Sequence, residues 1–260
     1  MQLVTGGDLL NQIISAGFAT RQMDFPFLGL YGACSTMSES LIVGTLALES
    51  GFVENVACAA SSHFSTAERQ FRTPLELGTQ KTPTAQRTVT GAGACVLGTQ
   101  GGNGPFVKGF TAGRVIDFGI KDANNMGAAM APAACDTLIH HFEDFSRKPS
   151  DYDAIYTGDL GKFGRQILAD KLAQQGYDAA GVLHDCGAEM FSDEQDPHMG
   201  GSGCGCCATV LNAVLVKQLR EGTFRRILVM ATGALLSPTS TLQGESIPSI
   251  AHAIILEREW

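Results

Sequence analysis

The stretch "GACSTMSESLIVGTLALESGFVENVACAASS" (residues 32–62) decides the fold, because it recurs in outline as "GCGCCATVLNAVLVKQLREGTFRRILVMATGA" (203–234). Each copy predicts a helix that ends 19 residues after its first glycine, at a second glycine of the C-cap type, Gly51 or Gly222. A short turn and an apolar strand follow in both copies. The two stretches therefore predict the same helix–turn–strand unit.

Two further pairs of segments repeat in the same order. "LVTGGDLLNQII" (3–14) is similar to "AIYTGDLGKFGRQIL" (154–168), and "TVTGAGACVLG" (88–98) is similar to "SIAHAIILE" (249–257). Chance similarity of generic strand–helix units is the alternative explanation, but three matches in one order favour an internal duplication. We predict two similar α/β halves, residues 1–105 and 106–260.

Apolar runs and glycines place the elements of each half. The first half is predicted to hold strands at 2–6, 27–32, 55–61 and 91–98 and helices at 8–21 and 34–50. The second half is predicted to hold strands at 107–113, 153–157, 182–187, 226–232 and 250–257 and helices at 128–145, 162–175 and 204–221. The strands are mostly uninterrupted apolar runs, which is typical of parallel sheets covered on both faces. The second half has one strand and one helix more than the first.

Composition excludes several classes of protein. The 260 residues carry a net charge of −8 and no basic run, which argues against a nucleic-acid partner. No stretch reaches the roughly 18 apolar residues of a membrane span, and "MQLVTGGDLL" lacks the pattern of a secretion signal. We therefore expect a soluble cytoplasmic chain.

The eight cysteines predict neither disulfides nor a metal site. Cys58, Cys95, Cys135 and Cys186 sit in apolar or small-residue stretches, which is typical of reduced thiols in a core. The cysteines of "GGSGCGCC" (200–207) are too closely spaced for a zinc site. No dinucleotide-binding motif or P-loop is complete, so no cofactor is predicted.

Two halves of βαβαβαββ order, with Cys34 at the start of the third helix of the first half, resemble the thiolase and ketoacyl-synthase superfamily. The stretches "PFLGLYGACSTMSES", "SSHFSTAERQFR", "GRVIDFGIKDANNMGAAMAPAACDT" and "ATGALLSPTS" resemble more closely the stage V sporulation protein AD family. The resemblance covers the whole chain. It implies a thiolase-like fold that binds dipicolinic acid (pyridine-2,6-dicarboxylate) and supports its uptake into the forespore.

The resemblance also implies that the chain begins inside the family pattern, without the first strand and helix of the first half. In the superfamily we expect that strand in the middle of its sheet, where its loss would leave buried backbone groups unpaired, at about 1–3 kcal/mol each. The chain is then either a fragment or a form whose first half closes in another way.

Thiolase-type chemistry needs Cys34 as the nucleophile and two further groups that move protons and hold the oxyanion. Where ketoacyl synthases III have a histidine, this chain has Gly158 or Asp159, and where thiolases have Gly-His-Pro it has Gly203 and Cys204. The late Cys-x-Gly of thiolases is replaced by Thr232 and Gly233. We therefore expect no proton acceptor beside Cys34 and interpret it as an inherited pocket residue. An active acyltransferase that uses Cys34 and an adaptor with a vestigial pocket remain alternatives.

A dicarboxylate ligand calls for cations, and arginine binds carboxylates bidentately. The loop 61–90 supplies Arg69 and Arg72, together with Lys81 and Arg87, although a solvated surface loop is the plainer interpretation. The predicted ligand-binding residues are Cys34, His63, Arg69, Arg72, His184, Ser202 and Gly203. Arg114 and Asp117 are weaker candidates that could equally form an internal ion pair. His140, His141 and His198 are predicted at the surface. His252 is predicted in the closing strand, from which it could approach Cys34.

The resemblance implies partners as well. The predicted ligand is dipicolinic acid, free or as its calcium salt, and the predicted protein partners are membrane proteins of the same sporulation transport assembly. The expected location is the cytoplasmic face of the forespore inner membrane, peripherally bound. Thiolase relatives usually pair through their first halves, so a homodimer is expected by analogy.

Overall fold

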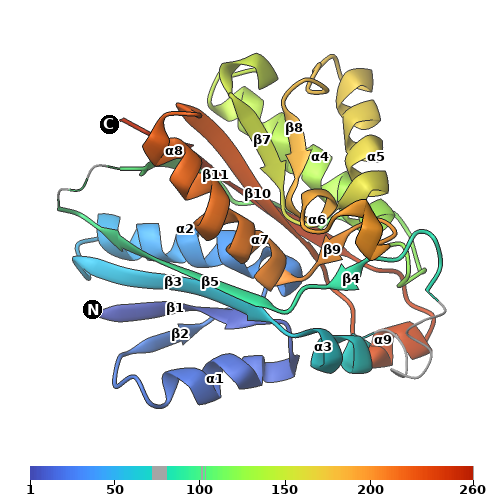
Figure 1. Cartoon of the computed structure of the whole chain (residues 1–260), viewed down its shortest axis with the longest axis horizontal. Helices are drawn as coiled ribbons and strands as arrows, with labels where there is room; N and C mark the ends of the chain where they lie inside the picture. The colour runs from blue at the N-terminus through green and yellow to red at the C-terminus, as the bar shows by residue number, and fades with distance from the viewer. Residues whose placement is uncertain (72–80, 101, 103, 260) are drawn as a thin grey trace.

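The computed structural model describes residues 1–71, 81–100, 102 and 104–259. Its first sheet has four strands in the order β2-β1-β3-β5 (Figure 1). These strands are β1 (Leu3–Asp8), β2 (Phe27–Gly29), β3 (Asn55–Ser62) and β5 (Gly91–Gly98). The first three are parallel, and β5 runs antiparallel to β3.

The second sheet has five strands in the order β6-β11-β10-β7-β8. They are β6 (Phe106–Thr111), β7 (Ala154–Thr157), β8 (Leu183–Asp185), β10 (Arg226–Ala234) and β11 (Ser249–Glu257). Strands β8, β7 and β10 are parallel, while β11 is antiparallel to both β10 and β6. Nearly every residue of β10 is buried, as an uninterrupted apolar run requires.

The same strand order occurs in both sheets, because β2-β1-β3-β5 corresponds to β8-β7-β10-β11 in order and direction. This correspondence confirms the duplicated fold that the sequence repeats predicted. It also corrects one expectation. Strand β6, the additional strand of the second sheet, lies at the edge beside β11 and not in the middle. The corresponding position in the first sheet is therefore the outer side of β5, where no central row of backbone groups is interrupted.

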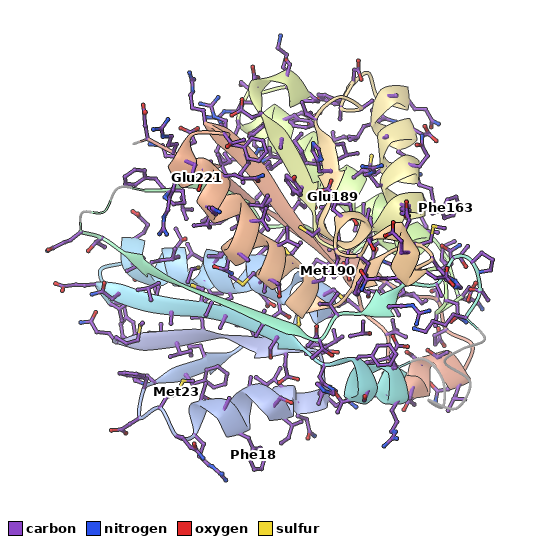
Figure 2. The ribbon with its side chains drawn as sticks, in the orientation of Figure 1. Phe18, Met23, Phe163, Glu189, Met190 and Glu221 are labelled. Carbon is purple, nitrogen blue, oxygen red and sulfur yellow. The ribbon has the colours of Figure 1, made fainter. Side chains whose placement is uncertain are left out.

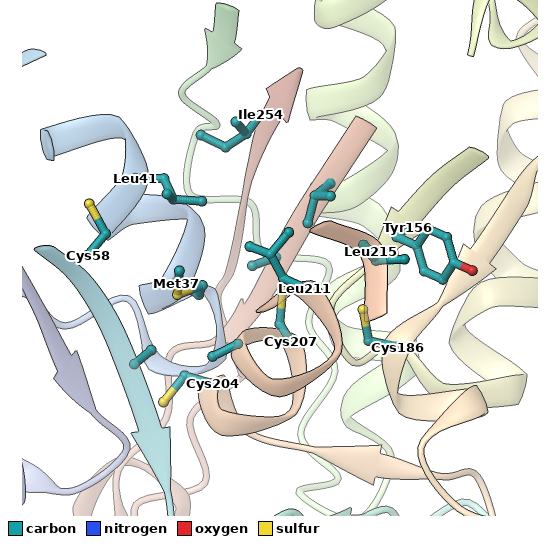
Figure 3. Close-up of a cluster of buried hydrophobic side chains, with 14 of the residues drawn as sticks. Met37, Leu41, Cys58, Tyr156, Cys186, Cys204, Cys207, Leu211, Leu215 and Ile254 are labelled. Carbon is teal, nitrogen blue, oxygen red and sulfur yellow. The ribbon is translucent and has the colours of Figure 1, made fainter. Parts of the chain in front are cut away.

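Helices lie between the two sheets and on their outer faces (Figure 1). Between the sheets run α2 (Thr36–Glu49) and α7 (Cys204–Val210), the latter continuing through a π-helical turn (Leu211–Leu215) into α8 (Val216–Glu221). Helix α2 contacts β1 and β3 and also β10 and β11, whereas α7 contacts β3 and β5 of the other sheet. Figure 3 shows side chains of this middle layer, among them Met37, Leu41 and Leu211, packed in one buried cluster.

Outer helices cover the remaining faces. Helix α1 (Ile14–Thr20) lies along the first sheet, and α4 (Met126–Asp144) and α5 (Gly161–Gln174) cover the second. The other helices are α3 (Phe64–Phe71), α6 (Cys186–Glu189) and α9 (Pro238–Leu242). Single 3₁₀ turns occupy Asn11–Ile13, Ala33–Ser35, Pro149–Asp151 and Asp193–Gln195.

A two-stranded sheet joins the two parts of the molecule. Strand β4 (Arg87–Thr88) pairs in parallel with β9 (Gly201–Ser202). Beside it, the Gln86 side-chain amide donates hydrogen bonds to the carbonyls of Asp159 (2.7 Å) and Gly201 (2.8 Å). Residues 86–88 are thus fixed to the second sheet's loops, next to the end of β7.

Candidate functional site

Cys34 lies at the turn between β2 and α2, within the 3₁₀ turn that leads directly into the helix. The preceding residue, Ala33, has a φ of 51°, a left-handed conformation that a non-glycine residue adopts only where its surroundings enforce it. The turn places the thiol at the N-terminal end of α2, buried to 5% exposure. The predicted strand–turn–helix elbow is therefore present.

Strand β10 reaches this elbow from the second sheet. A Cβ atom on Gly233 would lie 2.2 Å from the carbonyl oxygen of Gly32, so glycine is required for the approach. One turn further along α2, the backbone N–H of Ala231 donates to the Ser38 hydroxyl at 3.1 Å. The end of β10 is thereby fixed against the start of α2.

Asp159 is the group that faces Cys34 from the second sheet. Its fully buried carboxylate accepts hydrogen bonds from the Thr232 hydroxyl (2.9 Å), the Ser202 hydroxyl (3.2 Å) and the Gly203 backbone N–H (2.8 Å). The Cys34 thiol donates a further hydrogen bond to it. Burial raises the pKa of Asp159, and these four hydrogen bonds oppose that effect.

The expectation that no proton acceptor lies beside Cys34 is therefore wrong. The acceptor is a carboxylate at the position where ketoacyl synthases III have a histidine, as the sequence resemblance aligned it. A neutral imidazole that takes a thiol proton leaves an ion pair, but a carboxylate leaves only a neutral acid beside a thiolate.

A second buried carboxylate holds the loop that carries Asp159. Asp185 accepts hydrogen bonds from the Thr157 hydroxyl and from the backbone N–H groups of Leu160, Gly161 and Ala188, at 2.6–3.0 Å. Burial raises the pKa of Asp185 to about 6. Because its partners include the backbone N–H groups of Leu160 and Gly161 at the start of α5, Asp185 serves to shape the loop.

The cavity at Cys34 is small. It is lined by Leu9, Tyr31, Ala33, Cys34, Ala67, Phe71, Thr88, Met126, Ser202, Ala234 and Leu236. Its volume of about 20 Å³ holds about one water molecule. A pyridine dicarboxylate is much larger, so it enters only if part of the wall moves outward. The side chains that line the cavity in the described part of the chain carry no positive charge.

The structure brings together three of the predicted ligand-binding residues and separates others from them. Cys34, Ser202 and Gly203 meet around Asp159. His63, which directly precedes α3, and Arg69, within α3, are exposed and do not line the cavity. Arg72 lies outside the described residues. His184 stacks on Tyr156 and bonds Glu189 at 2.9 Å, away from the cavity.

The other cations of the predicted basic loop have partners of their own. Lys81 forms a buried ion pair with Glu68 at 3.0 Å, and the Arg87 side chain donates to the Asp196 carbonyl. Arg114 pairs with Asp136, whereas Asp117 accepts from Ser246, so the two do not pair with each other.

The histidines outside the predicted site do not line the cavity either. His252 accepts a hydrogen bond from the Gly113 backbone N–H at 3.1 Å. The prediction that His141 is at the surface is wrong, because it is fully buried between Thr111 and Tyr152.

Sequence reasoning noted Asp159 only as the residue found where a histidine was missing. A usable signal was its position directly after the apolar strand 153–157, because strand ends meet at one edge of a parallel sheet. The polar residues Ser202 and Thr232, from two other segments, are what make it a buried acceptor.

The fold and the cysteine elbow define a thiolase-like protein. Among solved structures, it is similar to the tetronic acid condensing enzyme AbyA1 (TM-score 0.63, 15% identity, 98% of this chain and 77% of that chain). It is also similar to 3-oxoacyl-(acyl carrier protein) synthase III from Pseudomonas aeruginosa PAO1 (TM-score 0.62, 14% identity, 100% and 77%). The Acat5 thiolase from Ascaris suum gives a TM-score of 0.58 at 10% identity, over 99% and 87%. At such identities these similarities show the fold alone.

A family model described as "Stage V sporulation protein AD (SpoVAD)" matches residues 1–257. The stage V sporulation protein AD of Bacillus subtilis (strain 168) is 46% identical over 258 residues, which is 99% of this chain and 76% of that protein. The chain therefore belongs to the stage V sporulation protein AD family. Among the described residues, every helix is too short or too polar to span a bilayer.

Proposed function

We propose that this sporulation protein is a non-catalytic thiolase-fold protein that binds dipicolinic acid and supports its uptake into the forespore. The Cys34–Asp159 contact is the observation that supports the absence of catalysis, because a carboxylate at this position keeps the proton on the sulfur. The ligand is the one that the family resemblance implies.

The electrostatics of the site bear on the form of the ligand. The buried Asp159 contacts Cys34 and Ser202, which line the cavity. The negative charge of Asp8 raises the pKa of the neighbouring Cys204 and Tyr31. A dianion is repelled by such a site, whereas the N-termini of α2 and α4 favour an anion. A one-to-one complex with calcium carries no net charge, so we propose that the calcium salt binds more tightly than the free dianion.

The proposal includes partners and location. The chain acts with membrane proteins of the same transport assembly, as a peripheral protein on the cytoplasmic face of the forespore inner membrane. A homodimer fits a set of exposed apolar side chains on α1 and around edge strand β2: Ile14, Phe18, Met23, Phe25 and Leu28. Figure 2 shows Phe18 and Met23 on the outer side of the molecule beside α1.

Ligand binding is tested by thermal unfolding with increasing dipicolinate, with and without equimolar calcium. A ligand at 100 times its Kd stabilises the folded state by about 2.7 kcal/mol, which raises Tm by a few degrees. Benzene-1,3-dicarboxylate, which lacks the ring nitrogen, is the control ligand. The Arg69→Ala and Arg72→Ala double variant tests the predicted cations. Absence of any shift at millimolar dipicolinate contradicts the binding proposal.

Iodoacetamide labelling at neutral pH separates this function from an acyltransferase. We expect Cys34 to be modified no faster than the other buried cysteines, because its thiol remains protonated beside Asp159. Rapid and selective modification of Cys34, or an acyl adduct on it seen by mass spectrometry, favours the enzyme. Slow labelling together with no ligand-induced shift favours an adaptor whose pocket is vestigial.

A further inference from the structure

Two cysteines outside the candidate site lie directly opposite each other in the first sheet. Cys58 of β3 and Cys95 of β5 are register partners in the antiparallel pair. Opposed residues in such a pair have Cα atoms about 4.5 or about 5.5 Å apart, and their side chains leave the sheet on the same face. Disulfides bridge Cα separations of about 4.4–6.8 Å, so the backbone already meets this requirement.

Both thiols face the middle layer of helices. Helix α2 makes room for the Cys58 sulfur at Gly44, where a Cβ atom would lie 2.6 Å from it. The Thr5 hydroxyl donates to the same sulfur at 3.5 Å. All eight cysteines are free thiols in this structure.

Solvent reaches one member of the pair. Cys95 lines a groove of about 540 Å³ between β5, α2 and the turn before α8. Cys95 is half-buried, whereas the other seven cysteines are buried. A small oxidant in water therefore meets the Cys95 sulfur first, with the Cys58 sulfur behind it on the neighbouring strand.

We propose that Cys58 and Cys95 are an oxidation site that forms a cross-strand disulfide on reaction with hydrogen peroxide. The Cys95 thiolate attacks one peroxide oxygen, breaks the O–O bond and becomes a sulfenic acid, releasing one water after proton transfer. The Cys58 sulfur then attacks the sulfenic sulfur, forms the S–S bond and releases the second water. Two thiols and one peroxide thus give one disulfide and two waters, and the peroxide takes up the two electrons.

The surroundings of Cys95 set the rate of the first step. Burial, and to a lesser degree the nearby Cys58, raise the pKa of Cys95 to about 12. Since the thiolate is the nucleophile, oxidation is slow at neutral pH and speeds up about tenfold per pH unit between pH 7 and 9. This site therefore responds to sustained oxidant and not to brief exposure.

The experiment treats the folded chain with hydrogen peroxide at pH 8, blocks remaining thiols with iodoacetamide and digests with trypsin plus glutamyl endopeptidase. These cleavages leave Cys58 in peptide 55–68, Cys95 in peptide 88–108 and Cys34 in neither. We expect a linked pair of these two peptides, lighter than their sum by two hydrogens and released by dithiothreitol. Recovery of both cysteines in alkylated form, after peroxide has consumed other thiols, overturns the proposal.

Variants sharpen the test. Cys58→Ser is expected to leave Cys95 as a sulfenic acid that dimedone captures, and Cys95→Ser to abolish peroxide-dependent loss of the Cys58 thiol. Cys135→Ser, in α4 on the other sheet, is the matched control and leaves the linked pair unchanged. Equal yields of several cysteine pairings in the wild type would also overturn the proposal, and this readout requires no variant to fold. The outcome is independent of whether the chain binds dipicolinate.

Discussion

Asp159 shows how a single residue redirects an inherited site. The cysteine elbow, the helix N-terminus behind it and the approach of β10 are all retained, while the partner of Cys34 is a carboxylate held by hydrogen bonds from Ser202, Gly203 and Thr232. Because these donors suit an ionised acceptor, the network stabilises the charge on Asp159 and leaves the thiol as a donor. On this proposal, the cysteine no longer acts as a nucleophile, although the fold around it is kept.

We expect Asp159→Asn to lower the free energy of unfolding by about 1–3 kcal/mol. Either orientation of the amide replaces one of the two acceptor oxygens by a donor, which faces the Thr232 hydroxyl or else the Ser202 hydroxyl and the Gly203 N–H. Urea denaturation at pH 7 measures the change. Asp193→Asn, an exposed partner of Lys162, is the control and should change stability by less than about 0.5 kcal/mol. An unchanged midpoint for Asp159→Asn would show that the network adds no stability.

At the scale of elements, the contact between β10 and the start of α2 depends on Gly233. A methyl group there would meet the Gly32 carbonyl oxygen, a backbone atom that cannot turn aside. We expect Gly233→Ala to destabilise the protein by about 1–3 kcal/mol, because the strand and the elbow must separate. Thermal unfolding is the measurement.

Gly17→Ala is the matched control for this prediction. Gly17 lies inside α1, with open space where its Cβ would be, so alanine should stabilise the helix by about 0.5–1 kcal/mol. If both variants shift Tm in the same direction and by the same amount, the close approach at Gly233 is not what limits stability.

The elements with strong apolar patterns could be predicted from sequence, and those held by contacts could not. The predicted helix 34–50 is found as Ala33–Glu49, and the strand at 91–98 agrees at both ends. Helix α3 was missed because "FSTAERQF" buries only Ala67 and Glu68. Strands β4 and β9 have two residues each, too few for any periodicity. They form because Gln86 donates to the Asp159 carbonyl and the N–H groups of Arg87 and Val89 donate to the carbonyls of Gly200 and Ser202.

The residues of the candidate site also fall into those that the sequence could identify and those that it could not. Cys34 could be identified from its place before a helix, because the elbow is local in sequence. The role of Asp159 depends on three segments that meet only in the folded chain, at residues 159, 202–203 and 232. The predicted roles of His63, Arg69, Arg72 and His184 stay predictions. For His63, Arg69 and His184, the sequence alone could not show where the side chains lie relative to the cavity, and Arg72 lies outside the described residues.

For the molecule as a whole, one buried histidine links stability to pH. His141 of α4 bonds Thr111 of β6 at 2.8 Å and the Tyr152 hydroxyl at 2.6 Å. Burial, helped by Arg147 and opposed by Asp144, lowers its pKa to about 4. The unfolded chain therefore binds this proton more readily than the folded chain, and the stability that His141 contributes above pH 6.5 is lost as pH falls to about 4.

We expect the destabilisation caused by His141→Asn to shrink by about 3 kcal/mol between pH 7 and pH 4. Comparing variant with wild type isolates this residue from Asp185, whose raised pKa of about 6 gives the opposite pH dependence in the same range. Urea unfolding at several pH values is the measurement. His140→Asn, at the neighbouring exposed position, is the matched control. A pH-independent effect of His141→Asn would mean that the pKa of His141 is the same in the folded and the unfolded chain.

The crossed middle layer, in which α2 touches β10 and α7 touches β3, has a practical consequence for anyone dividing the gene. Polypeptides 1–105 and 106–260 made separately would each expose an apolar surface that the other half covers in the intact chain, and each should aggregate or be degraded when produced alone. When the two polypeptides are co-expressed, they should associate into a soluble complex, as the fragments of a split reporter do. The boundary that is easiest to see in the repeated sequence is thus a poor place to cut.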